Sequence, residues 1–339
     1  MRDSDGKVAM SDQSPLWISE ADVVSLMSLG DAINALERGL LAEARGDAQN
    51  MVKTHVTWGR GSTLHAIGAV FAKDGFVGTK TWAHTEGGAT PLLILFDSGD
   101  GALKAVIEAF ALGQMRTGAA AGVATRWLAA ESAGELAIIG AGKQAATQVA
   151  AVVAVRPIRR IRVFGRNEER RAKFVARVKE EFGIEVVATS NVSEAVAGAP
   201  IITVVTRSTE PILFADMVGG GAHINAVGAI TPERAEISRG VLERCGHVVV
   251  DTIPSAQKLS RELIEYFGAE ASGWEPVKSL ASVVAAGRPR AASDDLTLFK
   301  SMGMGISDLA LGIELYHEAA RRGLGRGIAH PQKVAPRLR

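Results

Sequence analysis

The feature that most constrains the fold of this chain is the segment ELAIIGAGKQAATQV at residues 135–149. An apolar run ends at Ile139, and Gly140, Gly142 and Ala145 then match the spacing G-x-G-x-x-G/A. The first glycine permits a tight turn, the second lets a pyrophosphate approach the backbone, and the small third residue lets a helix pack on the strand. The N–H groups at the start of that helix can then bind phosphate. A strand–helix turn without a ligand is the alternative. The residues expected to bind a dinucleotide here are Gly140, Ala141, Gly142, Lys143 and Gln144.

Alternating strands and helices follow this turn. Apolar runs are separated by segments with helical spacing, and this rhythm predicts a doubly wound parallel sheet of the Rossmann type. The expected strands cover residues 136–139, 161–164, 186–188, 201–205, 224–227 and 248–251. The expected helices cover residues 144–154, 168–182, 193–197, 233–244 and 255–267, and a last helix covers residues 304–322.

The first third of the chain has a different pattern. Helical spacing over residues 31–45 is followed by strand-like runs that are separated by Gly, Asp and Ser turns without intervening helices. These runs are MVKTHVTW, TLHAIGAVF, FVGTKTWAH, PLLILFD and ALKAVIEA. They predict an antiparallel or mixed sheet. We therefore expect an α/β protein with an α+β domain over residues 15–128, to which residues 304–330 return, and a Rossmann dinucleotide-binding domain over residues 129–303.

Length and charge limit the classes of function. The chain has 339 residues, enough for two domains, and its net charge of +1 gives no general affinity for nucleic acid or for an anionic membrane. Its single cysteine, Cys245, fits a reducing compartment. The polar stretch over residues 1–15 predicts a loose tail rather than a secretion signal, and the apolar stretch over residues 136–155 is too interrupted to span a membrane. A cytoplasmic location is expected.

Arginines follow the second expected strand of the dinucleotide-binding domain. About twenty residues past the glycines, a carboxylate favours NAD, whereas an arginine can hold the 2′-phosphate of NADP. Gly165 and Arg166 occupy this point, and Asn167, Arg170 and Arg171 follow. The 2′-phosphate prefers bidentate guanidinium contacts, and a carboxylate would repel it. We expect Arg166, Asn167 and Arg170 to contact the cofactor, and NADP(H) to be preferred with NAD(H) possible. A solvated helix face is the alternative explanation, more for Arg170 and Arg171 than for Arg166.

Polar side chains interrupt the apolar runs of the first half. They are Lys53, His55, His65, Lys80, His84, Glu86 and Arg116. The histidines lack the i, i+3 or i, i+4 spacing of a metal site, so no metal is expected. Burying a lysine or an arginine without an anion is costly. Several such cations predict a pocket for a carboxylate-bearing substrate, and side chains that all point to water are the alternative.

Several segments together resemble the ornithine cyclodeaminase/mu-crystallin family, which also contains alanine dehydrogenases and ketimine or imine reductases. The segments are LGQMRTGAAAGVATRWLA, ELAIIGAGKQA, RIRVFGRN, HINAVGAITPERAEI and SDDLTLFKSMG, and they span about residues 30–320 in the family's order. The resemblance implies a homodimer whose first domain binds the substrate and forms the dimer. It also implies a nicotinamide dinucleotide in the Rossmann domain and a small amino or imino acid as substrate.

The resemblance also implies individual site residues. Lys80 falls on the lysine that binds the substrate carboxylate, and Arg116 on the arginine that reaches this carboxylate and the cofactor phosphates. Lys53 stands where an arginine that grips the substrate is expected, and a lysine is a weaker, non-bidentate substitute. Met302 is expected to line the nicotinamide pocket beside the substrate. The positions expected to contact the cofactor are Arg116, Thr117, Thr206, Arg207, Val227, Gly228, Ser301 and Gly303.

One departure from the family concerns the reaction. The resemblance implies that cyclodeaminases of the family have the sequence Gly-Gly-Asp after the fifth strand, where the aspartate accepts and donates protons. This chain has Gly228, Ala229 and Ile230 at these positions. Isoleucine cannot exchange a proton. We therefore expect an NAD(P)H-dependent imine or ketimine reductase, or an amino-acid dehydrogenase, that transfers a hydride at the α carbon of 2-imino or 2-amino carboxylates.

The proton donor of such a reaction should titrate near neutral pH. His65 is the first candidate because imidazole does so, and Lys80 is the second. Two alternatives for the whole protein stay open. One is an ornithine cyclodeaminase that forms proline and ammonia, and the other is an NADP-dependent protein that binds a small ligand without turnover.

Overall fold

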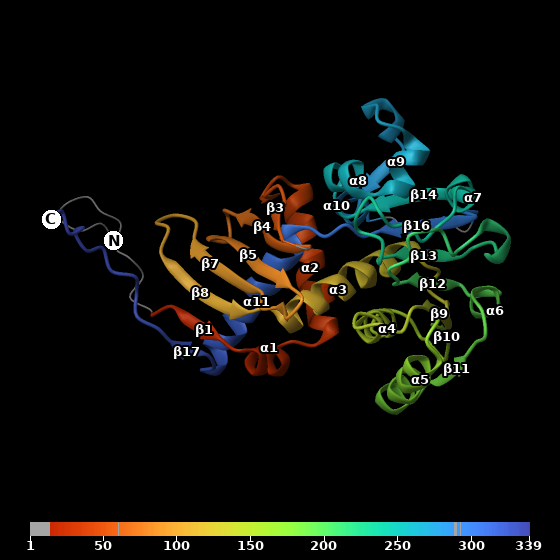
Figure 1. Ribbon diagram of the computed structural model, residues 1–339, viewed down its shortest axis with the longest axis horizontal. Helices are drawn as coiled ribbons and strands as arrows, with labels where there is room; N and C mark the ends of the chain where they lie inside the picture. The colour runs from red at the N-terminus through yellow and green to blue at the C-terminus, as the bar shows by residue number, and fades with distance from the viewer. Residues whose placement is uncertain (1–13, 60, 288–289, 292) are drawn as a thin grey trace. The chain divides into compact units, whose positions relative to one another are not determined.

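The computed structural model describes residues 14–339 except residues 60, 288–289 and 292. The tail predicted over residues 1–15 therefore lies almost entirely outside the described residues. The described chain divides into two compact units (Figure 1). The first contains residues 14–28, 45–113 and 304–339, and the second contains residues 29–44 and 114–303. Residues 29–44 and 114–128, which the sequence groups with the first domain, are thus grouped with the second unit.

The first unit is built on a mixed sheet. The strand order is β17-β1-β8-β7-β5-β4-β2, with β3 paired to β4 and β6 paired to β5. Strand β1 is parallel to β8 and the other described pairs are antiparallel, which confirms the expected antiparallel or mixed sheet. The strands are β1 (Leu16–Ile18), β2 (Ala48–Asn50), β3 (Thr54–Trp58), β4 (Ser62–Phe71), β5 (Phe76–Thr85), β6 (Gly88–Ala89), β7 (Leu92–Asp97), β8 (Leu103–Glu108) and β17 (Arg326–Gly327).

The two faces of this sheet differ in burial. Leu93 and Leu95 of β7 are fully buried, whereas Ile94 between them is partly exposed, as the two-residue period of a strand requires. Helix α11 (Gly305–Arg322) packs on the buried face, across β4, β5 and β7 (Figure 1). It begins one residue later than predicted, and α1 (Glu20–Leu26) packs beside it. The covered face of the sheet therefore forms the core of this unit.

The second unit contains the predicted doubly wound sheet. Its eight strands are all parallel, in the order β11-β10-β9-β12-β13-β16-β14-β15. The strands are β9 (Glu135–Ile139), β10 (Arg160–Phe164), β11 (Glu185–Ala188), β12 (Ile201–Val204), β13 (His223–Ala226), β14 (Cys245–Val250), β15 (Val277–Ser279) and β16 (Leu296–Lys300). The direction of winding reverses between β9 and β12, and ligands of such sheets bind beside the carboxyl ends of the strands at this point.

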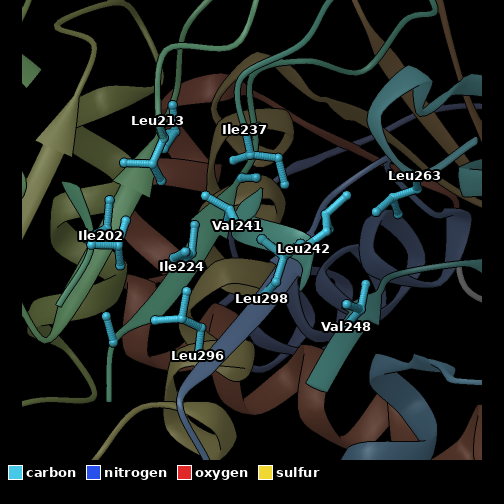
Figure 2. Close-up of a cluster of buried hydrophobic side chains, with 14 of the residues drawn as sticks. Ile202, Leu213, Ile224, Ile237, Val241, Leu242, Val248, Leu263, Leu296 and Leu298 are labelled. Carbon is cyan, nitrogen blue, oxygen red and sulfur yellow. The ribbon is translucent and has the colours of Figure 1, made fainter. Parts of the chain in front are cut away.

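Both faces of the parallel sheet are buried. Alternate residues of β9 and of β12 enter two separate apolar clusters, which explains why these strands read as continuous apolar runs. Figure 2 shows Ile202, Ile224 and Leu298 of three strands packed with Val241 and Leu242. The helices associated with this unit are α2 (Leu29–Ala44), α3 (Phe110–Leu128), α4 (Ala145–Val153), α5 (Glu168–Phe182), α6 (Val192–Val196), α7 (Arg239–Arg244), α8 (Ile253–Leu259), α9 (Arg261–Phe267) and α10 (Leu280–Ala286).

Helix α3 is absent from the elements expected from the sequence. Its glycines lower the helix propensity of the segment, and packing explains why two of them are present. A Cβ at Gly118 would lie 2.8 Å from Thr147, and a Cβ at Gly122 would lie 2.6 Å from Ile33. Glycine at these positions lets α3 approach α4 and α2 closely, so tertiary packing stabilises the helix.

Two predicted helices differ in extent. The helix expected over residues 233–244 begins only at Arg239, after Ser238 at the N-cap position. The helix expected over residues 255–267 is divided into α8 and α9 at Ser260, whose backbone is extended. Across the described ranges, no helix has both the length and the apolar character needed to cross a bilayer.

Candidate functional site

The glycine turn after β9 has the geometry that a dinucleotide requires. Gly140 has a φ of 115°, and a Cβ there would lie 2.5 Å from the carbonyl oxygen of Val205, so only glycine fits. Gly142 is exposed, and a Cβ there would have no atom within 4 Å. No described side chain caps α4 at Gln144, and its first N–H groups point toward this turn. The backbone thus has room for a pyrophosphate at a helix N-terminus.

The loop after β10 lies directly beside this turn. The N–H of Gly140 donates to the carbonyl oxygen of Phe164 over 2.8 Å, and a Cβ at Gly165 would lie 3.3 Å from that of Ala141. Arg166 is exposed on this loop. The structure therefore brings Arg166 next to the glycine turn, where a guanidinium can reach an adenosine ribose or its phosphate.

The other polar residues of this loop have structural partners. The Asn167 side chain accepts a hydrogen bond from the N–H of Arg170 over 2.8 Å and caps α5. The Arg171 guanidinium donates to the carbonyl oxygen of Gly165 over 2.8 Å, which holds the loop. The Arg170 side chain is exposed. Asn167 and Arg171 thus shape the loop that presents Arg166.

A buried carboxylate, Glu236, joins the loops that follow β12 and β13. Its Oε1 accepts hydrogen bonds from the N–H and the hydroxyl of Thr206 over 2.6 and 2.8 Å. Its Oε2 accepts from the N–H groups of Gly228 and Ala229 over 2.8 and 3.0 Å. Burial raises the pKa of Glu236, and the charge of Lys300 and the hydrogen bonds from Thr206 oppose this rise. Two loops predicted to contact the cofactor are therefore fastened to one side chain.

A second buried carboxylate, Asp251, holds the loop that follows β16. Its Oδ2 accepts hydrogen bonds from the Ser301 hydroxyl over 3.1 Å and from the N–H groups of Met302 and Gly303 over 2.7 and 2.5 Å. Burial raises the pKa of Asp251, and these hydrogen bonds oppose the rise. Gly303 has a φ of 88°, and a Cβ there would lie 3.1 Å from a guanidinium nitrogen of Arg116. This loop and Arg116 are thus neighbours.

Several predicted cofactor residues occupy different environments. Val227 is buried, Arg207 is exposed, and Thr117 is partly exposed next to Arg116 on α3. The side chain of Met302 packs in the apolar cluster of the second unit, so its proximity to a ligand would come from its backbone. The predicted roles of these residues stay predictions.

In the first unit, Lys80 is 3% exposed on β5 and its ammonium lies 2.5 Å from the carboxylate of Asp308, which is fully buried on α11. The same ammonium lies 5.2 Å from the centre of the Trp82 ring. A Cβ at Gly113 of α3 would lie 3.8 Å from this ammonium. A buried lysine therefore pairs with a buried carboxylate, close to the start of α3.

His65 is stacked between two other rings. The ring centres of His65 and Trp82 are 4.7 Å apart, and those of His55 and His65 are 5.5 Å apart. The Nε2 atom of His65 lies 2.7 Å from the Thr63 hydroxyl. Burial, and after it electrostatic interaction with Lys53, His55 and His84, lowers the pKa of His65 to about 4. The ring is therefore neutral at pH 7.

Three carboxylates of these sites, Glu236, Asp251 and Asp308, are not among the residues singled out from the sequence. The available signal is an acid inside an apolar run, as in HVVVD at Asp251 and GISDLALGI at Asp308. Such acids are rarely buried without a partner. The described residues contain no group of three or more His, Cys, Asp or Glu side chains suited to a metal ion.

Comparisons with known proteins agree with this architecture. The profile of the ornithine cyclodeaminase/mu-crystallin family matches residues 14–323. A Delta(1)-pyrroline-2-carboxylate reductase of Bacillus cereus is 32% identical over 241 residues, which cover 70% of this chain and 73% of that protein. The solved structure of the Thermococcus litoralis Delta(1)-pyrroline-2-carboxylate reductase, in complex with NADH and L-proline, matches with a TM-score of 0.85 at 28% identity and covers 92% of this chain and 100% of that chain.

A second solved structure, an archaeal alanine dehydrogenase dimer with bound NAD, matches with a TM-score of 0.84 at 29% identity. The match covers 93% of this chain and 99% of that chain. These matches confirm the α/β fold class and the resemblance that the sequence motifs indicate. The chain belongs to the ornithine cyclodeaminase/mu-crystallin family.

Proposed function

We propose that this protein is an NAD(P)H-dependent oxidoreductase that reduces the C=N bond of 2-imino carboxylates or, in reverse, oxidises the CH–NH2 bond of 2-amino carboxylates. The observation that carries the proposal is the glycine turn at Gly140 and Gly142, which leaves room for a pyrophosphate at the start of α4. The reactions named for the relatives, an imine reduction and an alanine dehydrogenation, support this class of chemistry.

We assign the cofactor to the second unit. The turn residues Gly140, Ala141, Gly142, Lys143 and Gln144 bind the pyrophosphate in this proposal. The remaining contacts come from Arg116, Thr117, Thr206, Arg207, Val227, Gly228, Ser301 and Gly303. When bound, the nicotinamide supplies a hydride for the α carbon of the substrate. Glu236 and Asp251 hold three of the contacting loops in place, so the site needs little rearrangement during the reaction.

We assign the substrate carboxylate to Lys80, Arg116 and Lys53. A cation that binds this carboxylate fixes the position of the neighbouring C=N bond, which accounts for much of the rate in such reactions. Reduction also requires a proton on the nitrogen. Because the pKa of His65 is lowered to about 4, a neutral imidazole is present at pH 7, and we favour the Lys80 ammonium as the donor over His65.

We propose a preference for NADP(H). The support is Arg166, an exposed guanidinium beside the glycine turn, on a loop where the described residues from Gly165 to Asn167 include no carboxylate. The solved relatives contain NADH or NAD, so NAD(H) stays a possible cofactor of this chain.

We also propose that the protein is a homodimer that acts in the cytoplasm. The outward face of the first unit's sheet carries exposed apolar side chains: Val56 is 57%, Leu64 46% and Val70 37% exposed. An exposed apolar face of this kind is typical of a protein interface. The single cysteine, Cys245, suits a reducing compartment.

A substrate panel tests the proposed reaction. The purified chain is given 2-oxo acids with ammonia or methylamine, or preformed cyclic imines, and the oxidation of NADPH and NADH is followed by absorbance. We expect oxidation that depends on both the 2-oxo acid and the amine. A parallel reaction with L-ornithine, monitored for ammonia and proline, should show no release. Ammonia release from ornithine without a net change in cofactor would instead establish a cyclodeaminase.

A further inference from the structure

A buried ion pair of the second unit lies at the carboxyl end of β16. Lys300 is the last residue of this strand, is fully buried, and is in register with Ala226 of β13 and Val250 of β14. Its ammonium lies 2.6 Å from the carboxylate of Glu262 on α9, whose side chain is 2% exposed. Beyond this contact, neither the ammonium nor Oε2 of Glu262 has a hydrogen-bond partner among the described residues. Each side chain therefore depends on the other for a polar partner.

The surroundings of Lys300 are apolar. Leu296 and Leu298 precede it at two-residue intervals on β16, so the three side chains share one face of the sheet. Both leucines belong to an apolar cluster that also contains Leu263, the neighbour of Glu262 on α9 (Figure 2). A buried ion pair gains little stability over apolar side chains of similar size. Stability alone therefore does not account for charged residues at this place.

Glu262 also holds the segment that carries Glu236. Its Oε1 accepts hydrogen bonds from the N–H groups of Glu236 and Ile237 over 2.5 and 3.0 Å. The carboxylate of Glu236 in turn accepts the hydrogen bonds from the loops after β12 and β13. Burial raises the pKa of Glu236, and the charge of Lys300 opposes this rise and favours the ionised form. Contacts thus run from Lys300 through Glu262 to Glu236, and from there to two loops.

We propose that Lys300 and Glu262 are positioning residues of the cofactor site, and that they act through Glu236 on the loops after β12 and β13. This inference rests on the proposed function, in which both loops contact a nicotinamide dinucleotide. An ionised Glu236 accepts the four hydrogen bonds of these loops, whereas a protonated carboxyl group turns a donor toward backbone donors. The pair therefore sets the affinity for the cofactor.

The first experiment removes the pair without leaving a lone buried charge. Lys300→Met alone leaves the Glu262 carboxylate without a counter-charge and can prevent folding, so the main variant is Lys300→Met/Glu262→Gln, whose new side chains are neutral and of similar size. The amide oxygen can still accept the two N–H groups, but Glu236 loses the neighbouring positive charge. We expect the Kd for NADPH and for NADH, measured by fluorescence titration, to rise by roughly tenfold, the effect of one unsatisfied buried hydrogen bond. Circular dichroism shows that the variant is folded.

The second experiment determines whether the pair acts through Glu236. The main variant is combined with Glu236→Gln, and substitutions that act through one group have effects that do not add. We expect the Kd of this combination to lie within roughly threefold of that of Glu236→Gln alone. Glu262→Asp keeps both charges and draws the carboxylate back by one methylene, so it tests the same contact if the main variant does not fold. It should also raise both Kd values.

The matched control is Arg177→Met/Glu181→Gln, which removes an exposed ion pair of α5 in the same unit and should leave both Kd values unchanged. Unchanged Kd values in a destabilised main variant, or in Glu262→Asp, overturn the inference and leave the proposed function standing. Additive losses in combination with Glu236→Gln also overturn it, because the pair then acts independently of Glu236. A wild-type protein that binds neither NADPH nor NADH contradicts the proposed function itself.

Discussion

At the scale of single residues, the first unit contains a buried ion pair of Lys80 and Asp308. Lys80 is 3% exposed and Asp308 is fully buried, so both charges have lost most of their hydration. Burial of a charge is tolerated when a partner of opposite sign lies within hydrogen-bond distance, as it does here at 2.5 Å. Asp308 therefore acts as a positioning residue that holds the Lys80 side chain in place.

Asp308→Asn should destabilise the protein strongly. The substitution leaves the buried ammonium of Lys80 without its counter-charge, and breaking a buried pair in this way costs about 3–5 kcal/mol. The control, Asp47→Asn, breaks the ion pair with Lys73, whose side chain is 73% exposed, and should change stability by less than about 1 kcal/mol. Urea unfolding of the two variants measures the difference, and equal shifts of their midpoints would show that the Lys80 pair is not important for stability.

Arg166→Ala should weaken NADPH binding selectively. Loss of charge-assisted hydrogen bonds to a 2′-phosphate should raise the Kd for NADPH by roughly tenfold or more, while the Kd for NADH, which lacks that phosphate, changes little. Arg177→Ala removes an exposed arginine of α5, the helix that follows the Arg166 loop, and serves as the control. Isothermal titration with both cofactors provides the two constants. An equal loss of affinity for NADH and NADPH would refute the assignment of Arg166.

At the scale of elements, the loops that we propose to contact the cofactor are held by acids that lie elsewhere in the chain. One carboxylate, Glu236, fastens the loops after β12 and β13 through four hydrogen bonds. Asp251, at the end of β14, does the same for the loop after β16. Each loop is held through backbone N–H groups, and the hydroxyls of Thr206 and Ser301 add a side-chain contact to two of them.

Glu236→Gln should impair cofactor binding more than turnover. The amide keeps one acceptor oxygen and turns an NH2 group toward backbone N–H donors, so one of the two loops loses its anchor. We expect KM for the cofactor to rise by roughly tenfold, the effect of an unsatisfied buried group, with a smaller change in kcat. Glu236→Asp, which keeps the charge, should restore part of the affinity, whereas Glu233→Gln at an exposed position should have no effect. A loss of stability with an unchanged KM would mean that Glu236 is only structural.

The parts of this architecture that can be predicted from the sequence are those with local signals. The turn at Gly140 is one, because its glycine spacing and its flanking strand and helix are contiguous. Helix α3 is not, because Gly118 and Gly122 oppose helix formation until they meet Thr147 and Ile33. The contacts of the buried carboxylates have no local signal either, since Asp251 binds residues 50 or more positions away and Asp308 pairs with a lysine 228 positions away. Only the folded chain shows these contacts.

The pKa of His65 is a further property that needs the fold. In the sequence, His65 is one histidine among several and its ordinary pKa suits a proton donor. Its pKa is depressed by burial within the sheet and because β3, β4 and β5 bring His55, His84 and Lys53 near it. The predicted role of His65 therefore depends on neighbours that no sequence spacing reveals.

At the scale of the whole molecule, assembly is proposed to use the outward face of the first unit's sheet. Leu64→Glu places a charge among the exposed apolar side chains of this face. The variant should be monomeric, because burying an unpaired carboxylate in the dimer interface is costly. Val24→Glu, at a position on α1 that is 65% exposed, is the control and should remain dimeric. Size-exclusion chromatography with light scattering distinguishes the two masses. A dimeric Leu64→Glu variant would contradict this interface.

The central claim for the whole molecule is that a nicotinamide hydride reaches the α carbon of a 2-imino carboxylate. The most direct measurement uses NADPH or NADH that carries deuterium at the transferred position of C4, together with a 2-oxo acid and ammonia, and mass spectrometry of the amino acid formed. The account predicts a product with one deuterium on its α carbon, in an amount equal to the cofactor oxidised. Amino acid formed without deuterium, or oxidation of the cofactor without any amino acid, would contradict it.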